Sequence, residues 1–157
     1  MIETKSMYLE ELMPLIVEQL DRGASVRIYP RGTSMLPMIR EGLDSVVLSS
    51  VPERPSKYDV MLYQRKNGKY VLHRLVGVGD KYAFLGDNQF CVERGITHEQ
   101  LIARVSYFYR GEKQISVENP SYKLFCRIWH YSRFIRRVCR GSVVLIKRAI
   151  SKCMKKV

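Results

Sequence analysis

Ser34 and His73 are the two residues of this chain whose side chains could together carry out covalent chemistry. Ser34 lies in the segment Gly32-Thr33-Ser34-Met35-Leu36-Pro37, where glycine and proline indicate a tight turn. A serine hydroxyl is a poor nucleophile at neutral pH, so it needs a base within hydrogen-bond reach and donors for the oxyanion that develops on an attacked carbonyl. An imidazole, with an unperturbed pKa of about 6.5, suits the role of base. The pair therefore indicates acyl transfer through a serine.

Two acids compete for the role of orienting the imidazole. Asp87 lies in Gly86-Asp87-Asn88, and Glu93 follows it along the chain. A carboxylate that accepts a hydrogen bond from the second ring nitrogen fixes the tautomer and stabilises the imidazolium. Either acid could instead be a solvated loop residue or bond its own backbone, so the residue types alone leave both open.

Six segments, taken in order along the chain, resemble a clan of serine peptidases that includes type I signal peptidases and the self-cleaving SOS-response repressors. The resemblance runs from about Val26 to about Tyr107. His73-Arg74-Leu75 is similar to the His-Arg-Val of eukaryotic-reticulum-type signal peptidases, which points to the Ser-His branch. The segments are the nucleophile box Gly32–Pro37, the strands Arg40–Val47 and Tyr58–Tyr63, the base segment His73–Gly77, the Leu85–Asn88 box and the closing strand Ile102–Val105.

This resemblance implies a serine endopeptidase that cleaves an extended precursor or leader peptide through an acyl-enzyme, with Ser34 as nucleophile and His73 as base. It favours Glu93 as the third member, because that member follows the Gly-Asp-Asn box by a few residues in this branch. Asp87 and Asn88 would then hold the loop. Many signal peptidases carry a hydroxyl donor where this chain has Gly32, so the oxyanion is expected to use the backbone N–H groups of Thr33 and Ser34.

Two other functions compete with the peptidase. A self-processing regulator of the repressor kind carries a DNA-binding domain, for which residues 1–24 leave no room. The alternative that stays open is a non-catalytic peptide-binding or membrane-attached scaffold that retains the peptidase fold. We expect no cofactor and no metal, because His98 and His130 lack the context of metal ligands.

Hydrophobic periodicity predicts a mainly β fold with helices at both ends. The resemblance implies that this fold is of the signal-peptidase or repressor type. Residues 1–24 are expected to form an amphipathic helix that stops at Gly23 and is kinked or shortened at Pro14. Residues 25–110 have the short apolar runs and turn signals of a β domain. Within them, Gln64–Tyr70 predicts a hairpin tip with positive backbone angles at Asn67-Gly68, which delivers His73 on its return strand. Residues 111–120 are expected to be a linker.

The positive charge of the chain is concentrated in residues 121–157. This segment holds eleven of the 27 Lys and Arg residues and no Asp or Glu. Apolar residues recur there at three- and four-residue steps, which predicts a basic amphipathic helix broken at Gly141. Two interpretations stay open. The helix lies on an anionic membrane surface, or it packs its apolar stripe on the domain and leaves its arginines in water. No nucleic-acid-binding motif accompanies the charge, which disfavours nucleic acid as a partner.

The location of the protein is predicted from what the sequence lacks. It has no secretory signal and no run of about 18 apolar residues, whereas type I signal peptidases usually carry a membrane anchor. Its four cysteines lack close pair spacing and are expected to be reduced thiols. We therefore expect a cytoplasmic enzyme, either free or peripheral on the inner face of the membrane, whose partner is a peptide or protein substrate. The oligomeric state is left open.

Overall fold

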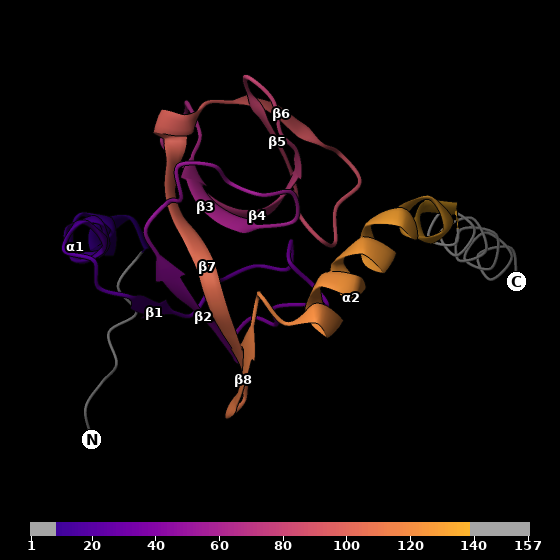
Figure 1. The fold of residues 1–157 in the computed structure, drawn as a ribbon, viewed down its shortest axis with the longest axis horizontal. Helices are drawn as coiled ribbons and strands as arrows, with labels where there is room; N and C mark the ends of the chain where they lie inside the picture. Colours follow the sequence, from indigo (N-terminus) through magenta and orange to yellow (C-terminus); the bar gives the residue numbers. More distant parts are fainter. Residues whose placement is uncertain (1–8, 139–157) are drawn as a thin grey trace, which may run out of the picture.

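An eight-stranded antiparallel sheet forms the body of the protein, with a helix on either side (Figure 1). The computed structural model describes residues 9–138. The strand order is β1-β2-β7-β3-β4-β5-β6, and β8 also pairs with β7. The expectation of a mainly β fold with terminal helices is confirmed. The strands are β1 (Val26–Ile28), β2 (Asp44–Ser49), β3 (Val60–Gln64), β4 (Tyr70–Gly77), β5 (Tyr82–Leu85), β6 (Glu93–Ile96), β7 (Leu101–Arg110) and β8 (Lys113–Ser116).

Helix α1 (Leu9–Asp21) precedes the first strand. It runs past Pro14, so that proline does not end it. The helix stops where the sequence predicted, because Gly23 adopts a φ of 76° that favours glycine. The Gly23 amide donates to the Leu20 carbonyl and the next amide donates to the Gln19 carbonyl, which satisfies the last turn.

The hairpin of β3 and β4 forms in the expected place, but the turn at its tip is of another type than the sequence predicted. The Gly68 amide donates to the Arg65 carbonyl, and the Arg65 amide donates to the Lys69 carbonyl. Of the two tip residues, Gly68 has a positive φ, at 83°, and Asn67 does not. The prediction of positive angles at both residues was therefore wrong: a turn centred on Lys66 and Asn67 precedes a single left-handed glycine.

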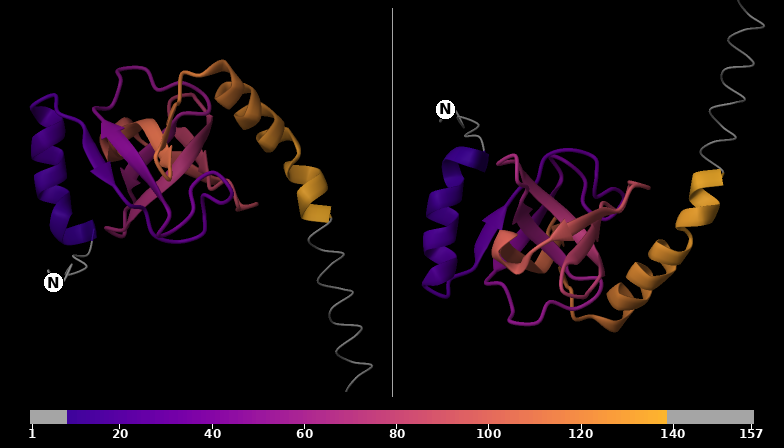
Figure 2. Two further views of the ribbon diagram at one scale, coloured as in Figure 1. Left: turned by 90° about the horizontal axis from the view of Figure 1, so that it is seen from below. Right: turned by 90° about the horizontal axis from the view of Figure 1, so that it is seen from above.

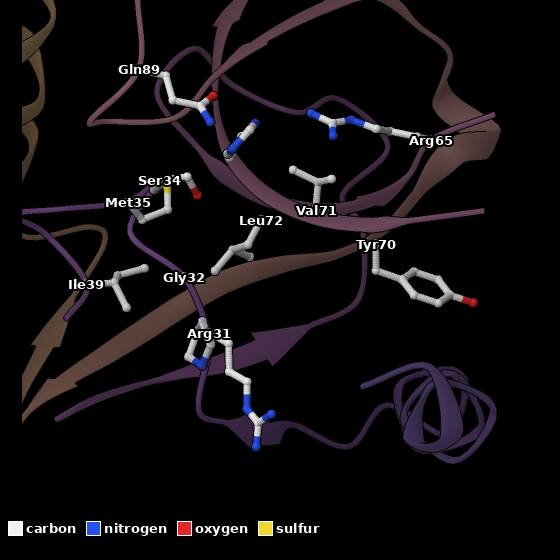
Figure 3. Close-up of a pocket in the computed structure, with 12 residues that line it drawn as sticks. Arg31, Gly32, Ser34, Met35, Ile39, Arg65, Tyr70, Val71, Leu72 and Gln89 are labelled. Carbon is white, nitrogen blue, oxygen red and sulfur yellow. The ribbon is translucent and has the colours of Figure 1, made fainter. Parts of the chain in front are cut away.

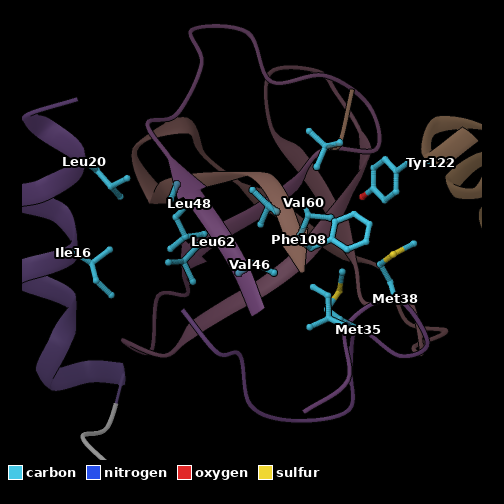
Figure 4. Close-up of a cluster of buried hydrophobic side chains, with 14 of the residues drawn as sticks. Ile16, Leu20, Met35, Met38, Val46, Leu48, Val60, Leu62, Phe108 and Tyr122 are labelled. Carbon is cyan, nitrogen blue, oxygen red and sulfur yellow. The ribbon is translucent and has the colours of Figure 1, made fainter. Parts of the chain in front are cut away.

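Strand β3 separates two hydrophobic clusters. Val60 and Leu62 point into the larger one, which Figure 4 shows reaching α1 at Ile16 and Leu20. Met61 points into the smaller one with its strand neighbour Tyr63 and with residues of β4 and β5. Both faces of β3 are therefore buried, and so is the middle of β4 from His73 to Leu75.

The C-terminal part of the described chain leads away from the sheet. Residues 111–120, expected as a linker, contain β8, which pairs with β7. Helix α2 (Pro120–Tyr131) begins at Asn119, whose side chain accepts a hydrogen bond from the Ser121 amide. Figure 2 shows α2 on the opposite side of the sheet from α1. Helical structure resumes at 133–138; the break predicted at Gly141 lies outside the described residues.

The apolar stripe of α2 does not pack on the sheet. On the side of α2 that faces the sheet, Tyr122 and Cys126 are buried, whereas Leu124 and Ile128 of the stripe are exposed. The interpretation in which the stripe covers the domain is therefore wrong for the part of the tail that the structure describes. Across residues 9–138, none of the helices has both the length and the apolar character needed to cross a bilayer.

Candidate active site

Ser34 and His73 line the same pocket, although they come from distant parts of the chain (Figure 3). The pocket has a volume of about 240 Å³. Ser34 is partly exposed at its wall, and His73 is 3% exposed. The hydroxyl and the imidazole form no hydrogen bond with each other in this conformation. The other lining residues are Pro30, Arg31, Gly32, Met35, Ile39, Arg65, Tyr70, Val71, Leu72 and Gln89.

The turn that carries Ser34 is fastened to the loop of Gly86, Asp87 and Asn88. The Asn88 amide donates to the Ser34 carbonyl over 2.8 Å, and its side-chain Nδ2 donates to the Thr33 carbonyl over 3.1 Å. A Cβ on Gly86 would lie 2.8 Å from the Ser34 carbonyl oxygen, closer than such contacts occur. Only glycine therefore allows the two loops to approach, and Asn88 holds them together as expected for a loop residue.

The backbone around Ser34 leaves an amide available to a ligand. Thr33 uses its carbonyl to accept from Asn88 and from the Leu36 amide. The Ser34 amide has no acceptor among the residues that the structure describes. It can therefore donate to an oxyanion without first giving up a hydrogen bond within the protein.

The Tyr63 hydroxyl lies between His73 and Glu93. Met61 pairs with His73 across the hairpin and Tyr63 pairs with Val71, so the tyrosine and the histidine are diagonal neighbours on one face. The Tyr63 hydroxyl donates to Glu93 Oε2 over 2.7 Å and lies 3.3 Å from His73 Nδ1. Since its one proton goes to the carboxylate, the hydroxyl must accept from Nδ1–H. The neutral ring then carries its lone pair on Nε2, as a general base requires.

Glu93 therefore reaches His73 through Tyr63 and makes no direct hydrogen bond to it. Arg65 donates from Nε to Glu93 Oε1 over 2.8 Å and from a terminal nitrogen to Oε2 over 2.6 Å. These hydrogen bonds, more than the one from Tyr63, hold the pKa of Glu93 below its usual value despite partial burial. Glu93 is therefore an ionised carboxylate, and it ends a series of hydrogen bonds that runs from His73 through Tyr63.

Burial lowers the pKa of His73 to about 4, because the charged ring is poorly solvated among the strands. The positive charge of Arg65 lowers it further, while Glu93 and Asp87 oppose both effects. The imidazole is consequently neutral at neutral pH.

Asp87 is engaged by Arg74 in a buried ion pair. Arg74 donates from Nε to Oδ1 over 2.8 Å and from a terminal nitrogen to Oδ2 over 2.6 Å. The two N–H groups of the other terminal nitrogen are shared among three acceptors: the Tyr58 carbonyl, the Tyr122 hydroxyl and the Cys126 sulfur. Both carboxylate oxygens of Asp87 are thus bound by Arg74, on the face of β4 opposite to His73. Asp87 is therefore bound to β4 through Arg74 and makes no hydrogen bond to His73.

Helix α2 is attached to the same loop. Trp129 Nε1 donates to the Asp87 carbonyl over 2.8 Å, and Arg136 donates to that carbonyl over 3.2 Å. The Arg136 guanidinium lies 3.7 Å from the centre of the Trp129 ring, a cation–π distance. The C-terminal helical segment therefore contacts the loop that holds the Ser34 turn.

Sequence reasoning missed Tyr63, Arg65 and Arg74 as parts of the site. The signal for Tyr63 was present in the hairpin: a tip near Asn67-Gly68 places Tyr63 and His73 on the same face of adjacent strands. Arg65 and Arg74 had no such signal, because nothing in their spacing distinguishes a buried or bridging arginine from a solvated one.

The other two histidines and the two described cysteines do not line the pocket. His98 bonds the Tyr82 hydroxyl at 3.2 Å, and His130 packs edge-on against Tyr58. Between residues 9 and 138 there is no group of three His, Cys, Asp or Glu that could hold a metal ion. Cys91 is an exposed free thiol and Cys126 a buried one; Cys139 and Cys153 lie outside the described residues.

Comparison of the chain with protein-family models, with curated proteins and with solved structures finds no match.

Replacing Asp87 with alanine is expected to destabilise the fold by about 3–5 kcal/mol, because it leaves the buried Arg74 charge without its partner. Denaturant unfolding measures the loss. Asp80→Ala, at an exposed acid in a loop, is the matched control and should change stability by less than about 0.5 kcal/mol. Equal effects of the two substitutions would contradict the structural role of the pair.

Protonation of His73 is expected to weaken the fold in acid. The ring takes up a proton near pH 6.5 when unfolded and only near pH 4 when folded, so the unfolded chain binds more protons between these values. The stabilisation from the neutral ring is full above about pH 6.5 and is lost as the pH falls towards 4, by about 3 kcal/mol. Unfolding of the wild type and His73→Gln across this range measures it, and an identical pH slope in both would disprove the assignment.

Proposed function

We propose that the chain is a serine endopeptidase of the signal-peptidase type, with Ser34 as nucleophile and His73 as general base. The observation that carries the proposal is that the serine hydroxyl and the imidazole line one pocket, with the imidazole bonded on its Nδ1 side to Tyr63. The missing direct hydrogen bond does not oppose it, because catalytic hydrogen bonds are often long in proteins without substrate. The same proposal assigns the sheet to the signal-peptidase and repressor type of β fold.

In the acylation step, Ser34 Oγ attacks the carbonyl carbon of the scissile peptide bond while its proton passes to His73 Nε2. The C–N bond of the tetrahedral intermediate then breaks, and His73 returns the proton to the departing amine. In deacylation a water attacks the ester, again losing a proton to His73, and Ser34 leaves with that proton. Peptide and water are consumed and two shorter peptides are released.

Glu93 and Tyr63 support the charged state of the base. As His73 becomes an imidazolium, its Nδ1–H donates more strongly to the Tyr63 hydroxyl, which in turn donates to the carboxylate of Glu93. Tyr63 is a positioning residue in this scheme, since it keeps the ring in the tautomer that faces Ser34. Burial raises the pKa of Tyr63, so its hydroxyl stays protonated and continues to donate to Glu93.

The oxyanion is assigned to the backbone N–H of Ser34, with that of Thr33 as the second candidate donor. The Ser34 amide is available, and Asn88 fixes the peptide groups on either side of Ser34 through the carbonyls of Thr33 and Ser34. A donor held in place before the reaction is worth roughly 2.7–4 kcal/mol in transition-state stabilisation.

The substrate is an extended peptide bound beside β4. The first part of this strand, residues 70–73, pairs with β3 on one edge, while β5 begins to pair only at Arg74. Tyr70, Val71 and Leu72 line the pocket on that second edge, with Gly32 also in its wall. An added strand could satisfy the backbone groups there and bring its carbonyl to Ser34.

A fluorophosphonate probe, which reacts with activated serines, is expected to label the wild-type protein at Ser34. Ser34→Ala should abolish labelling and cleavage of a peptide library, and His73→Gln should reduce both by more than about a thousandfold. Ser25→Ala, at another exposed serine, is the control and should behave as the wild type. Peptide binding without labelling would contradict the enzyme and support the non-catalytic scaffold.

Tyr63→Phe is expected to lower kcat by about 10–100-fold with little change in KM, because the base loses its orienting acceptor while the peptide groove keeps its shape. The acid limb of the pH profile should move to lower pH, since the imidazolium loses a hydrogen-bond acceptor. Tyr82→Phe removes a hydroxyl that bonds His98 outside the pocket and is the matched control. Unchanged kcat and pH profile in Tyr63→Phe would remove Tyr63 from the mechanism.

A further inference from the structure

The side of α2 that faces away from the sheet carries a continuous apolar stripe. Its members follow one another at alternating steps of four and three residues, so they lie on one side of the helix and its extension. Each is between 54% and 71% exposed. We call this set the outer stripe: Leu124, Ile128, Tyr131, Ile135 and Val138.

The inner side of the helix is already occupied, so the stripe cannot turn inward. Tyr122 and Cys126 are buried against Arg74, and Trp129 and Arg136 bond the Asp87 carbonyl. Rotating the helix to bury the outer stripe would break all of these contacts. The stripe is therefore presented to a partner.

The charge around the stripe selects that partner. Lys123 and Arg127 are exposed on the same helix, and the segment 121–157 contains eleven Lys or Arg residues and no acid. Two such segments would repel each other, which disfavours a second copy of this chain. An anionic bilayer attracts basic residues and accepts apolar side chains together. Phe134, 75% exposed beside the stripe, adds an aromatic ring of the kind found at membrane interfaces.

We propose that the outer stripe docks α2 on the surface of an anionic lipid bilayer. The apolar residues enter the boundary between headgroups and acyl chains, while the basic residues contact anionic headgroups. Because the inner side of the helix is attached to the Asp87 loop, docking holds the pocket of Ser34 and His73 at the membrane surface. Docking through the outer stripe does not require the chemistry of Ser34. Membrane docking and peptidase activity can therefore be disproved independently.

The test is cosedimentation of the full chain with vesicles of phosphatidylglycerol and phosphatidylcholine, compared with vesicles of phosphatidylcholine alone. The wild type should bind the anionic vesicles and lose most of that binding at about 1 M salt, where charges are screened beyond about 3 Å. The triple variant Leu124→Ser/Ile128→Ser/Ile135→Ser should bind them at least about tenfold more weakly, because each change removes an apolar group from the interface.

The matched control is Leu15→Ser/Leu43→Ser/Val78→Ser, which removes three exposed apolar side chains elsewhere and should bind as the wild type. Circular dichroism checks that both triple variants fold. Ser34→Ala should also bind normally, which separates docking from catalysis. Unchanged binding of the outer-stripe variant would overturn the proposal. So would sedimentation without lipid showing that the wild type self-associates and that this variant does not.

Discussion

The buried ion pair of Arg74 and Asp87 is the constraint on which the arrangement of the site depends. A guanidinium removed from water is tolerated only when nearly every donor is satisfied, and Arg74 meets this condition with the acid, a backbone carbonyl, a hydroxyl and a sulfur. These partners come from three separate parts of the chain: the segment before β3, the loop of Asp87, and α2. The pair therefore fixes β4, the loop of Asp87 and α2 relative to one another.

The position of the imidazole follows from the same pair. His73 and Arg74 are consecutive in β4, so their side chains lie on opposite faces of the sheet. The arginine binds the loop whose next residue, Asn88, holds the Ser34 turn. One face of β4 thus binds the loop that holds the Ser34 turn, while the other face presents the His73 ring to the pocket. Helix α2 belongs to this unit rather than to a separate tail, because it bonds the Asp87 carbonyl.

The parts of this structure that are set by local rules could be predicted from the sequence. Gly23 ends α1 because a left-handed residue is needed there, and the hairpin before His73 follows from its turn residues. The contact between Ser34 and Asn88 joins segments far apart in sequence, and no local rule predicts it. The hairpin tip places Tyr63 and His73 on one face, but the hydrogen bond from Tyr63 to Glu93 could not be foreseen, since it joins residues far apart in sequence and a tyrosine in an apolar strand also fits a core position.

Desolvation of His73 has a consequence for the speed of the enzyme that we propose. A ring whose conjugate acid dissociates near pH 4 is a weak base, so taking a proton from a hydroxyl is further uphill than for imidazole in water. The carboxylate of Glu93 returns only part of that driving force, because Arg65 already neutralises much of its charge. A buried ring of this kind should give slow turnover, and that turnover should persist into mildly acidic solution because the ring stays neutral there.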